Sequence, residues 1–90
     1  MKVGILGLGL IGGSLARVYA LEGHTVFACE KDESILSFAM LAGAVHRPLD
    51  DSTVPECDLI LLAIYPAGSA NWLADHAHLL RKDKIGRAHV

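Results

Sequence analysis

Three glycines stand at the spacing G-x-G-x-x-G early in the chain, as Gly7, Gly9 and Gly12. They follow the apolar run Val3 to Leu6 and open a stretch with helical periodicity. Such a turn binds phosphate, because free N–H groups at a helix N-terminus attract an anion. The first glycine permits a tight turn, the second lets the backbone approach a pyrophosphate, and the third lets helix and strand pack closely. The residues predicted to contact the cofactor here are Gly7, Gly9, Leu10, Ile11 and Gly12. A structural turn without a ligand is the alternative, since nine glycines in 90 residues produce chance matches.

A carboxylate follows the next predicted strand. Glu30 comes directly after the stretch His24 to Cys29 and lies 18 residues after Gly12. In dinucleotide sites, the acidic residue that accepts hydrogen bonds from the adenosine ribose comes about 20 residues after the glycines. A carboxylate there favours NAD, because the 2′-phosphate of NADP would meet a like charge. Lys31 is a second predicted cofactor contact that could hold a phosphate, so NADP stays open. The alternative for Glu30 is a solvated loop charge.

Residues 58–64, Asp-Leu-Ile-Leu-Leu-Ala-Ile, are the clearest strand of the sequence, and Tyr65-Pro66 ends it. Ligands of open α/β sheets bind just beyond the carboxyl ends of the strands. The residues that this rule places beside the cofactor are Ala63, Ile64, Tyr65 and Pro66. Tyr65 either packs against the cofactor or is a surface aromatic residue at a strand end.

The elements that must position these residues alternate between strands and helices. Helices are predicted at residues 10–21 and 33–42 and within 68–80. Residues 44–47 are expected to form a short third strand, and 48–57 a polar loop to which we assign no chemistry. This order predicts an α/β fold, a Rossmann-like doubly wound parallel sheet truncated to its first half.

Apolar spacing also predicts which helix faces are buried. The first helix is expected to bury Ile11, Leu15, Val18 and Tyr19. The second is expected to bury Ile35, Phe38, Ala39 and Ala42. Trp72 lies off the apolar stripe of the third helix, so we expect a part of the protein outside these residues to cover it.

Composition and charge exclude several classes of protein. Hydrophobic residues make up 52% of the chain, which suits strands buried on both faces. The net charge of −2 gives no nucleic-acid or membrane footprint, and no apolar run approaches the ~20 residues of a membrane span. Cys29 and Cys57 lie 28 residues apart, so we expect free thiols and no metal. We predict a cytoplasmic protein.

The last six residues differ in character from the rest. Ile-Gly-Arg-Ala-His-Val at 85–90 does not have the pattern of the next expected strand and matches a translated frame of a common sequencing adapter. We therefore expect residues 1–84 to be the N-terminal part of a dinucleotide-binding domain and 85–90 to be a non-native tail. A natural short tail is the alternative.

The stretch from Gly7 to Ala16, with its Gly-Gly-Ser-Leu continuation, closely resembles the opening of prephenate and arogenate dehydrogenases. Residues 42–44 and 57–66 add to the resemblance, which covers residues 1 to about 84. Two departures stand out: Glu30 replaces the usual aspartate, and Tyr65 stands where smaller residues are frequent.

The resemblance implies an NAD(P)-dependent oxidoreductase of tyrosine biosynthesis that oxidatively decarboxylates prephenate or arogenate. It implies a homodimeric parent protein whose catalytic histidine lies beyond this region, so no catalytic residue is assigned and this piece alone is expected to be inactive. One alternative is another β-hydroxyacid or imine dehydrogenase, although these usually carry Met in place of Ile11. The other is a non-catalytic nucleotide-binding module.

Overall fold

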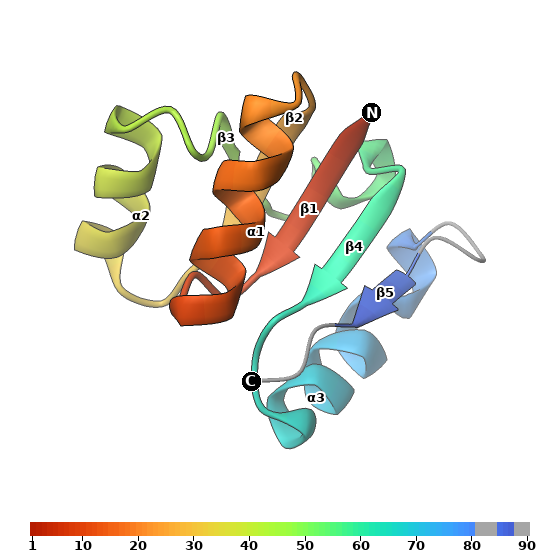
Figure 1. Cartoon of the computed structure of the whole chain (residues 1–90). Coiled ribbons are helices and arrows are strands. Elements are labelled where there is room, and N and C mark those ends of the chain that lie inside the picture. The colour runs from red at the N-terminus through yellow and green to blue at the C-terminus, as the bar shows by residue number, and fades with distance from the viewer. Residues whose placement is uncertain (81–84, 88–90) are drawn as a thin grey trace.

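The computed structural model describes residues 1–80 and 85–87, which form a parallel sheet covered by helices (Figure 1). The strands are β1 (Lys2–Leu6), β2 (Thr25–Cys29), β3 (Arg47–Pro48), β4 (Leu59–Leu62) and β5 (Ile85–Arg87). Their order in the sheet is β3-β2-β1-β4-β5, and every neighbouring pair is parallel. This arrangement confirms the predicted Rossmann-like half fold.

The helices connect these strands on both faces of the sheet. They are α1 (Leu10–Leu21), α2 (Glu33–Leu41), α3 (Pro66–His76) and the short 3₁₀ helices η1 (Val54–Glu56) and η2 (Ala77–Leu79). Helices α1 and α2 lie on one face, and α3 lies on the other (Figure 1). The connections are therefore those of a doubly wound sheet.

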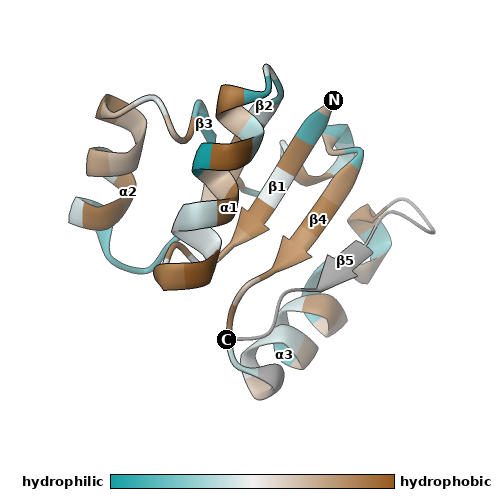
Figure 2. Ribbon diagram, viewed as in Figure 1, coloured by the Kyte–Doolittle hydropathy of each residue, from teal (hydrophilic) through white to brown (hydrophobic). Residues whose placement is uncertain are grey.

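Two separate cores result, because successive side chains of a strand point to opposite faces. The core on the α1 and α2 side includes Val3, Ile5, Val26, Ala28, Leu61 and Ala63. The core on the α3 side includes Leu6, Phe27, Leu49, Cys57, Ile60 and Leu62. Figure 2 shows β4 and most of β1 as apolar, as expected of strands buried on both faces.

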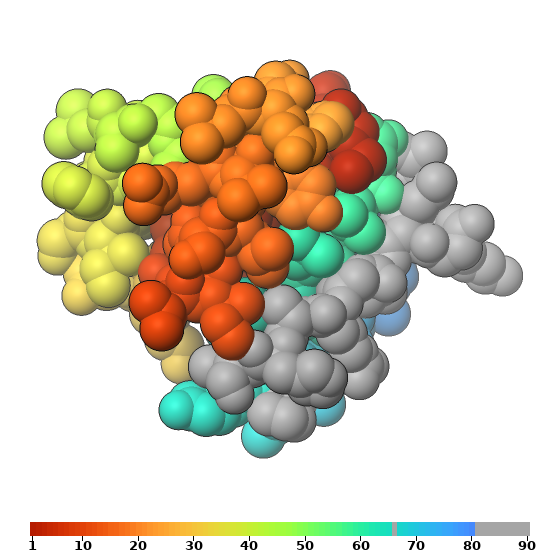
Figure 3. Space-filling view, in the orientation of Figure 1, coloured from red at the N-terminus to blue at the C-terminus, as the bar shows by residue number. Residues whose placement is uncertain are grey.

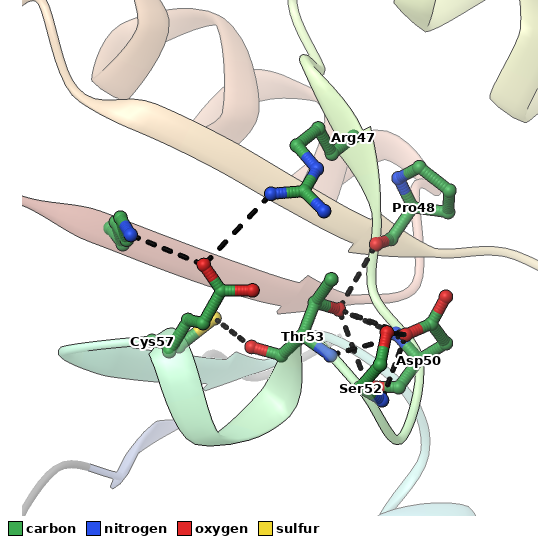
Figure 4. Close-up of polar contacts among 8 residues, drawn as sticks. Arg47, Pro48, Asp50, Ser52, Thr53 and Cys57 are labelled. Atoms are coloured by element: carbon green, nitrogen blue, oxygen red, sulfur yellow. Dashed lines mark hydrogen bonds and ion pairs between the residues drawn. The ribbon is translucent and has the colours of Figure 1, made fainter.

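The connection between β3 and η1 is held by its own side chains (Figure 4). The Asp50 carboxylate accepts hydrogen bonds from the Ser52 N–H (3.0 Å), the Ser52 hydroxyl (2.6 Å) and the Thr53 N–H (3.1 Å). Thr53 is buried, and its Oγ1 accepts from the Asp50 N–H at 2.8 Å and donates to the Pro48 carbonyl at 3.1 Å. The predicted loop thus closes the second core.

The third strand lies later than expected. The Ala44 and Val45 N–H groups both donate to the Ala39 carbonyl at the end of α2, at 3.0 and 3.2 Å. These two amides are therefore not available to a sheet ladder. Pairing with β2 begins at His46, whose N–H donates to the Val26 carbonyl at 2.8 Å. The prediction of a strand at 44–47 was wrong by about three residues at its start.

The third helix starts earlier than expected, at Pro66 and not at residue 68. Proline is favoured in the first turn of a helix, where an N–H group has no partner within the helix. Trp72 is half-buried against the second core, next to Leu73. This chain therefore covers part of Trp72 itself, and cover of the remainder by a further part of the protein stays a prediction.

The predicted buried faces of α1 and α2 are only partly correct. Val18 is 51% exposed, Phe38 is 72% exposed, and Ile35 and Ala42 are also exposed. Helix α2 instead packs through Leu36 and Ala39. Six of the seven residues at 35–41 are apolar, so periodicity alone does not select one face. Figure 3 shows α1 and α2 next to each other on the face of the molecule turned toward the viewer.

Residues 85–87 form β5, which pairs with β4 through Ile60 and Ile85, Leu61 and Gly86, and Leu62 and Arg87. The expectation that this segment has no strand was wrong. A parallel ladder uses backbone groups, so the edge of β4 accepts a short extended segment with little regard to its side chains. Whether 85–90 is native stays a prediction, and residues 81–84 and 88–90 lie outside the described residues.

Candidate functional site

Three strands end at the same level of the sheet and bring the predicted residues together. Leu6 of β1 pairs with Cys29 of β2 on one side and with Leu62 of β4 on the other. The chain then leaves all three strands at one edge, where the Gly7 N–H donates to the Cys29 carbonyl at 2.8 Å. The glycine-rich turn, Glu30 and Ala63 therefore follow neighbouring strand ends.

The first and third glycines of the motif are required by the protein itself. Gly7 has φ +93°, and a Cβ atom there would lie 2.5 Å from Cγ2 of Ile64 and 2.8 Å from the Ala63 carbonyl oxygen. A Cβ atom on Gly12 would overlap the Gly7 carbonyl. Side chains at these two positions would separate α1 from the ends of β1 and β4.

The second glycine, Gly9, has no such explanation in the protein. Its φ of −68° is open to any residue, and a Cβ atom there would meet no described protein atom within 4 Å. Gly9 is also the N-cap of α1, and no side chain of the described residues caps this helix end. The first turn of α1 therefore starts without a side-chain cap, beside a glycine that the described protein contacts do not require.

Glu30 turns its carboxylate toward this loop. Its Oε1 accepts a hydrogen bond from the Leu8 N–H at 2.9 Å, and its Oε2 accepts one from the Asp32 N–H at 3.0 Å. Glu30 is half-buried, so it is not the solvated loop charge that the sequence left open. Each carboxylate oxygen keeps a further lone pair for another donor.

A cleft of about 630 Å³ lies beyond the strand ends. Of the predicted residues, those lining it are Gly7, Glu30, Lys31, Ile64 and Tyr65. Ala63 is buried beneath the turn, Ile11 is half-buried, and Gly9 and Leu10 line a neighbouring groove with Phe38. Pro66 begins α3 at this edge of the sheet. Tyr65 is 74% exposed, which leaves it accessible at the cleft.

Sequence reasoning missed the wall that α3 contributes. Asn71, Trp72 and Asp75 also line the cleft. The indole of Trp72 stacks on the His76 imidazole with ring centroids 4.3 Å apart, and the His76 ring bonds to the Trp72 carbonyl at 2.8 Å. The signal was present, since residues 71 and 75 share one helix face. Both residues fall within the helix predicted at 68–80, but which face of that helix meets the strand ends is decided by its packing on the sheet.

The described part of the site contains no activated thiol and no metal cluster. Cys29 lines the cleft, but burial and the neighbouring Glu30 charge raise the pKa of its thiol. Burial together with the charges of Glu56 and Asp58 raises the pKa of Cys57 to about 11. Within residues 1–80 and 85–87, no group of three metal-ligating side chains comes together. The geometry of the described residues supports ligand binding.

The fold and the site together define a dinucleotide-binding domain of the oxidoreductase type. A protein-family model described as NADP oxidoreductase, coenzyme F420-dependent, matches residues 2–85, and the chain belongs to this family. It is an NAD(P)-binding dehydrogenase-type N-terminal domain. No curated protein matches this chain, and no helix among the described residues is long and apolar enough to span a membrane.

Several solved dehydrogenases share the fold over the whole chain. Arogenate dehydrogenase from Synechocystis has a TM-score of 0.84 and 26% identity, covering 100% of this chain and 32% of that one. Prephenate dehydrogenase from A. aeolicus, in complex with hydroxyphenyl propionate and NAD+, has a TM-score of 0.77, 20% identity and coverages of 99% and 33%. 3-Hydroxyisobutyrate dehydrogenase from Mycobacterium tuberculosis has a TM-score of 0.85 and 19% identity, covering 98% of this chain and 31% of that one. This chain spans about a third of each of these proteins.

Proposed function

We propose that this chain is the NAD-binding part of a dehydrogenase that oxidatively decarboxylates prephenate or arogenate. The observation that carries the binding role is Gly9, a glycine that no described protein contact requires, at an uncapped helix N-terminus. A pyrophosphate lying on the N–H groups of α1 supplies the missing reason for it. Glu30 is aimed at the same turn, where it can also receive ribose hydroxyls.

The helix start at α1 and the cleft beside it have separate roles in holding the cofactor. The first turn of α1 holds the pyrophosphate, and Glu30 orients the adenosine ribose. Trp72 offers an aromatic face to the base, backed by its stack with His76. Bound there, the nicotinamide would accept a hydride from the ring carbon that bears the substrate hydroxyl. The base that accepts the hydroxyl proton is assigned to a part of the enzyme outside this chain.

The charges around the cleft support NAD over NADP, although the family's description names NADP. Among the described residues that line the cleft, Glu30 and Asp75 supply two carboxylates and Lys31 supplies one ammonium group. A 2′-phosphate would meet the Glu30 carboxylate, which two backbone amides hold in place.

Trp72 is the only tryptophan of the chain, so its fluorescence follows binding directly. We expect NAD to bind this chain more tightly than NADP, and the Glu30→Gln variant to narrow the difference.

The substrate class is supported by the resemblance of residues 7–16 and 57–66 and by the 26% identity to arogenate dehydrogenase. The test begins with independent sequencing of the source DNA through codon 84 and beyond. The complete protein is then assayed for cofactor reduction with prephenate, arogenate and 3-hydroxyisobutyrate. Turnover of prephenate or arogenate is the expected result.

Other outcomes separate the parts of the proposal. Turnover of 3-hydroxyisobutyrate alone would overturn the substrate class and favour the β-hydroxyacid alternative, whose fold match is equally good. NAD binding by a complete protein that turns over none of them would favour a non-catalytic module. Native codons continuing through residues 85–90 would show that the tail is natural.

A further inference from the structure

Glu30 makes a contact that a purely ribose-binding residue does not need. Leu8 lies inside the glycine motif, between Gly7 and Gly9, and its N–H donates to Oε1 of Glu30 at 2.9 Å. Among the described residues, one backbone hydrogen bond also joins this turn to β2. It runs from the Gly7 N–H to the Cys29 carbonyl. The Glu30 side chain therefore anchors the middle of the turn to the end of β2.

The anchor is charged and held from both sides. Oε2 of Glu30 accepts the Asp32 N–H at 3.0 Å, so the carboxylate cannot rotate away from Leu8 without losing a second bond. Hydrogen bonds to an ionised acceptor are about twice as strong as neutral ones. The Leu8 side chain is buried at 7% exposure, which fixes the same segment from the opposite direction.

We infer that Glu30 is a positioning residue for the pyrophosphate turn in addition to its role toward the ribose. Its carboxylate holds the Leu8 amide so that the N–H groups of the following helix start point at the phosphates. This inference rests on the proposed dinucleotide binding. It predicts that loss of Glu30 weakens ligands that carry phosphates but have no ribose hydroxyl for Glu30 to bind.

The test compares ADP with 2′,3′-dideoxy-ADP, which keeps the pyrophosphate and lacks both hydroxyls. Dissociation constants are measured by Trp72 fluorescence for the natural chain and for Glu30→Ala and Glu30→Gln. We expect Glu30→Ala to weaken dideoxy-ADP about tenfold, as loss of one hydrogen bond to a charged group implies. Glu30→Gln keeps one acceptor, so its effect should be smaller. Glu33→Ala removes a neighbouring exposed acid outside the cleft and is the matched control.

A second readout separates positioning from general destabilisation. Amide hydrogen exchange at Leu8 should accelerate in Glu30→Ala relative to Glu33→Ala, while exchange at Ile5 in the first core stays unchanged. Weakened ADP with unchanged dideoxy-ADP would overturn the inference and leave Glu30 as a ribose ligand only. Failure of the natural chain to bind ADP at all would instead count against the proposed function.

Discussion

Two turns of this molecule solve the same problem in different ways. The segment from Asp50 to Thr53 satisfies its backbone amides with its own side chains, through the Asp50 carboxylate and the Thr53 hydroxyl (Figure 4). Among the described residues the glycine turn before α1 has no such side chains, and the side-chain acceptor of its Leu8 N–H, Glu30, comes from the segment that follows β2. The first turn is complete as a piece of structure, whereas the second leaves donors for something else.

This difference separates a structural turn from a binding turn without reference to sequence motifs. Buried polar groups must be paired, so a turn that pairs its own groups has nothing left for a ligand. A helix start without a cap, next to a glycine that the protein does not require, is open to an anion. Changes in the first turn should therefore affect stability alone, and those at Gly9 should affect binding alone.

The largest loss of stability is expected at Gly12, which belongs to the glycine motif and also lies where α1 packs against the strand ends. In Gly12→Ala the added methyl overlaps the Gly7 carbonyl, so α1 must move away from the strand ends. We expect a loss of about 3 kcal/mol or more in the free energy of unfolding, measured by urea titration. Gly13→Ala is the control, because a Cβ atom on Gly13 would lie in ordinary contact with the Leu8 carbonyl oxygen, 3.5 Å away. Equal stability of the two variants would contradict this close packing.

The next effect tests the self-contained turn. In Thr53→Val the side chain keeps its shape, but the Asp50 N–H loses its acceptor and the Pro48 carbonyl its donor. Because Thr53 is buried, we expect a loss of about 1–3 kcal/mol in the free energy of unfolding. ADP affinity, followed by Trp72 fluorescence, should stay unchanged once the variant is folded. A fall in affinity would show that this turn contributes to the site.

The reverse pattern is expected at Gly9. A Cβ atom there meets no protein atom, so Gly9→Ala should change the free energy of unfolding by no more than about 1 kcal/mol. The same Cβ would stand in the approach of a pyrophosphate to the backbone. We expect ADP binding to weaken about tenfold or more, equivalent to about 1.4 kcal/mol. Unchanged ADP affinity of Gly9→Ala in calorimetry would contradict the claim that the glycine turn, unlike the Asp50 turn, serves ligand binding.

The edge of the sheet where the site lies was predictable from the sequence, and the wall of the site was not. Glycine spacing and apolar strand ends locate Gly7, Gly12 and Glu30, because both signals depend on local backbone geometry. The contribution of Trp72 and Asp75 depends on how α3 packs against the sheet, which its own sequence pattern does not determine. The hydrogen bond from Leu8 to Glu30 joins residues 22 apart in sequence, and no local pattern encodes it.

The buried faces of the helices show the same limit. Helix α2 is apolar nearly all round, so its packing through Leu36 and Ala39 is decided by contact with the sheet. Likewise, the third strand begins late because the Ala44 and Val45 N–H groups both donate to the Ala39 carbonyl. Periodicity predicts that an element exists, and tertiary contacts then decide which side of it is covered.

The smallest expected effect is a loss of folding stability at low pH, to which the Asp50 turn and the Asp32 cap of α2 contribute. Hydrogen bonds from Ser52 lower the pKa of Asp50, and hydrogen bonds from Ser34 lower the pKa of Asp32, the cap of α2. A carboxyl whose pKa is lower in the folded state stabilises the fold above its unfolded pKa, here near 3.8. That contribution is lost as the pH falls through the folded value, so stability should decline below about pH 4.

Substitution assigns this acid sensitivity to the turn or to the helix cap. In Asp50→Asn the amide cannot ionise, so the unfolding free energy measured between pH 5 and pH 2 should fall less steeply than in the natural chain. Glu22→Gln is the control, because Glu22 is an exposed carboxylate outside this turn, at the end of α1. ADP affinity at pH 7 should be the same in both variants, since the Asp50 turn satisfies its own groups. An unchanged pH slope in Asp50→Asn would mean that the Asp50 carboxylate does not hold the turn.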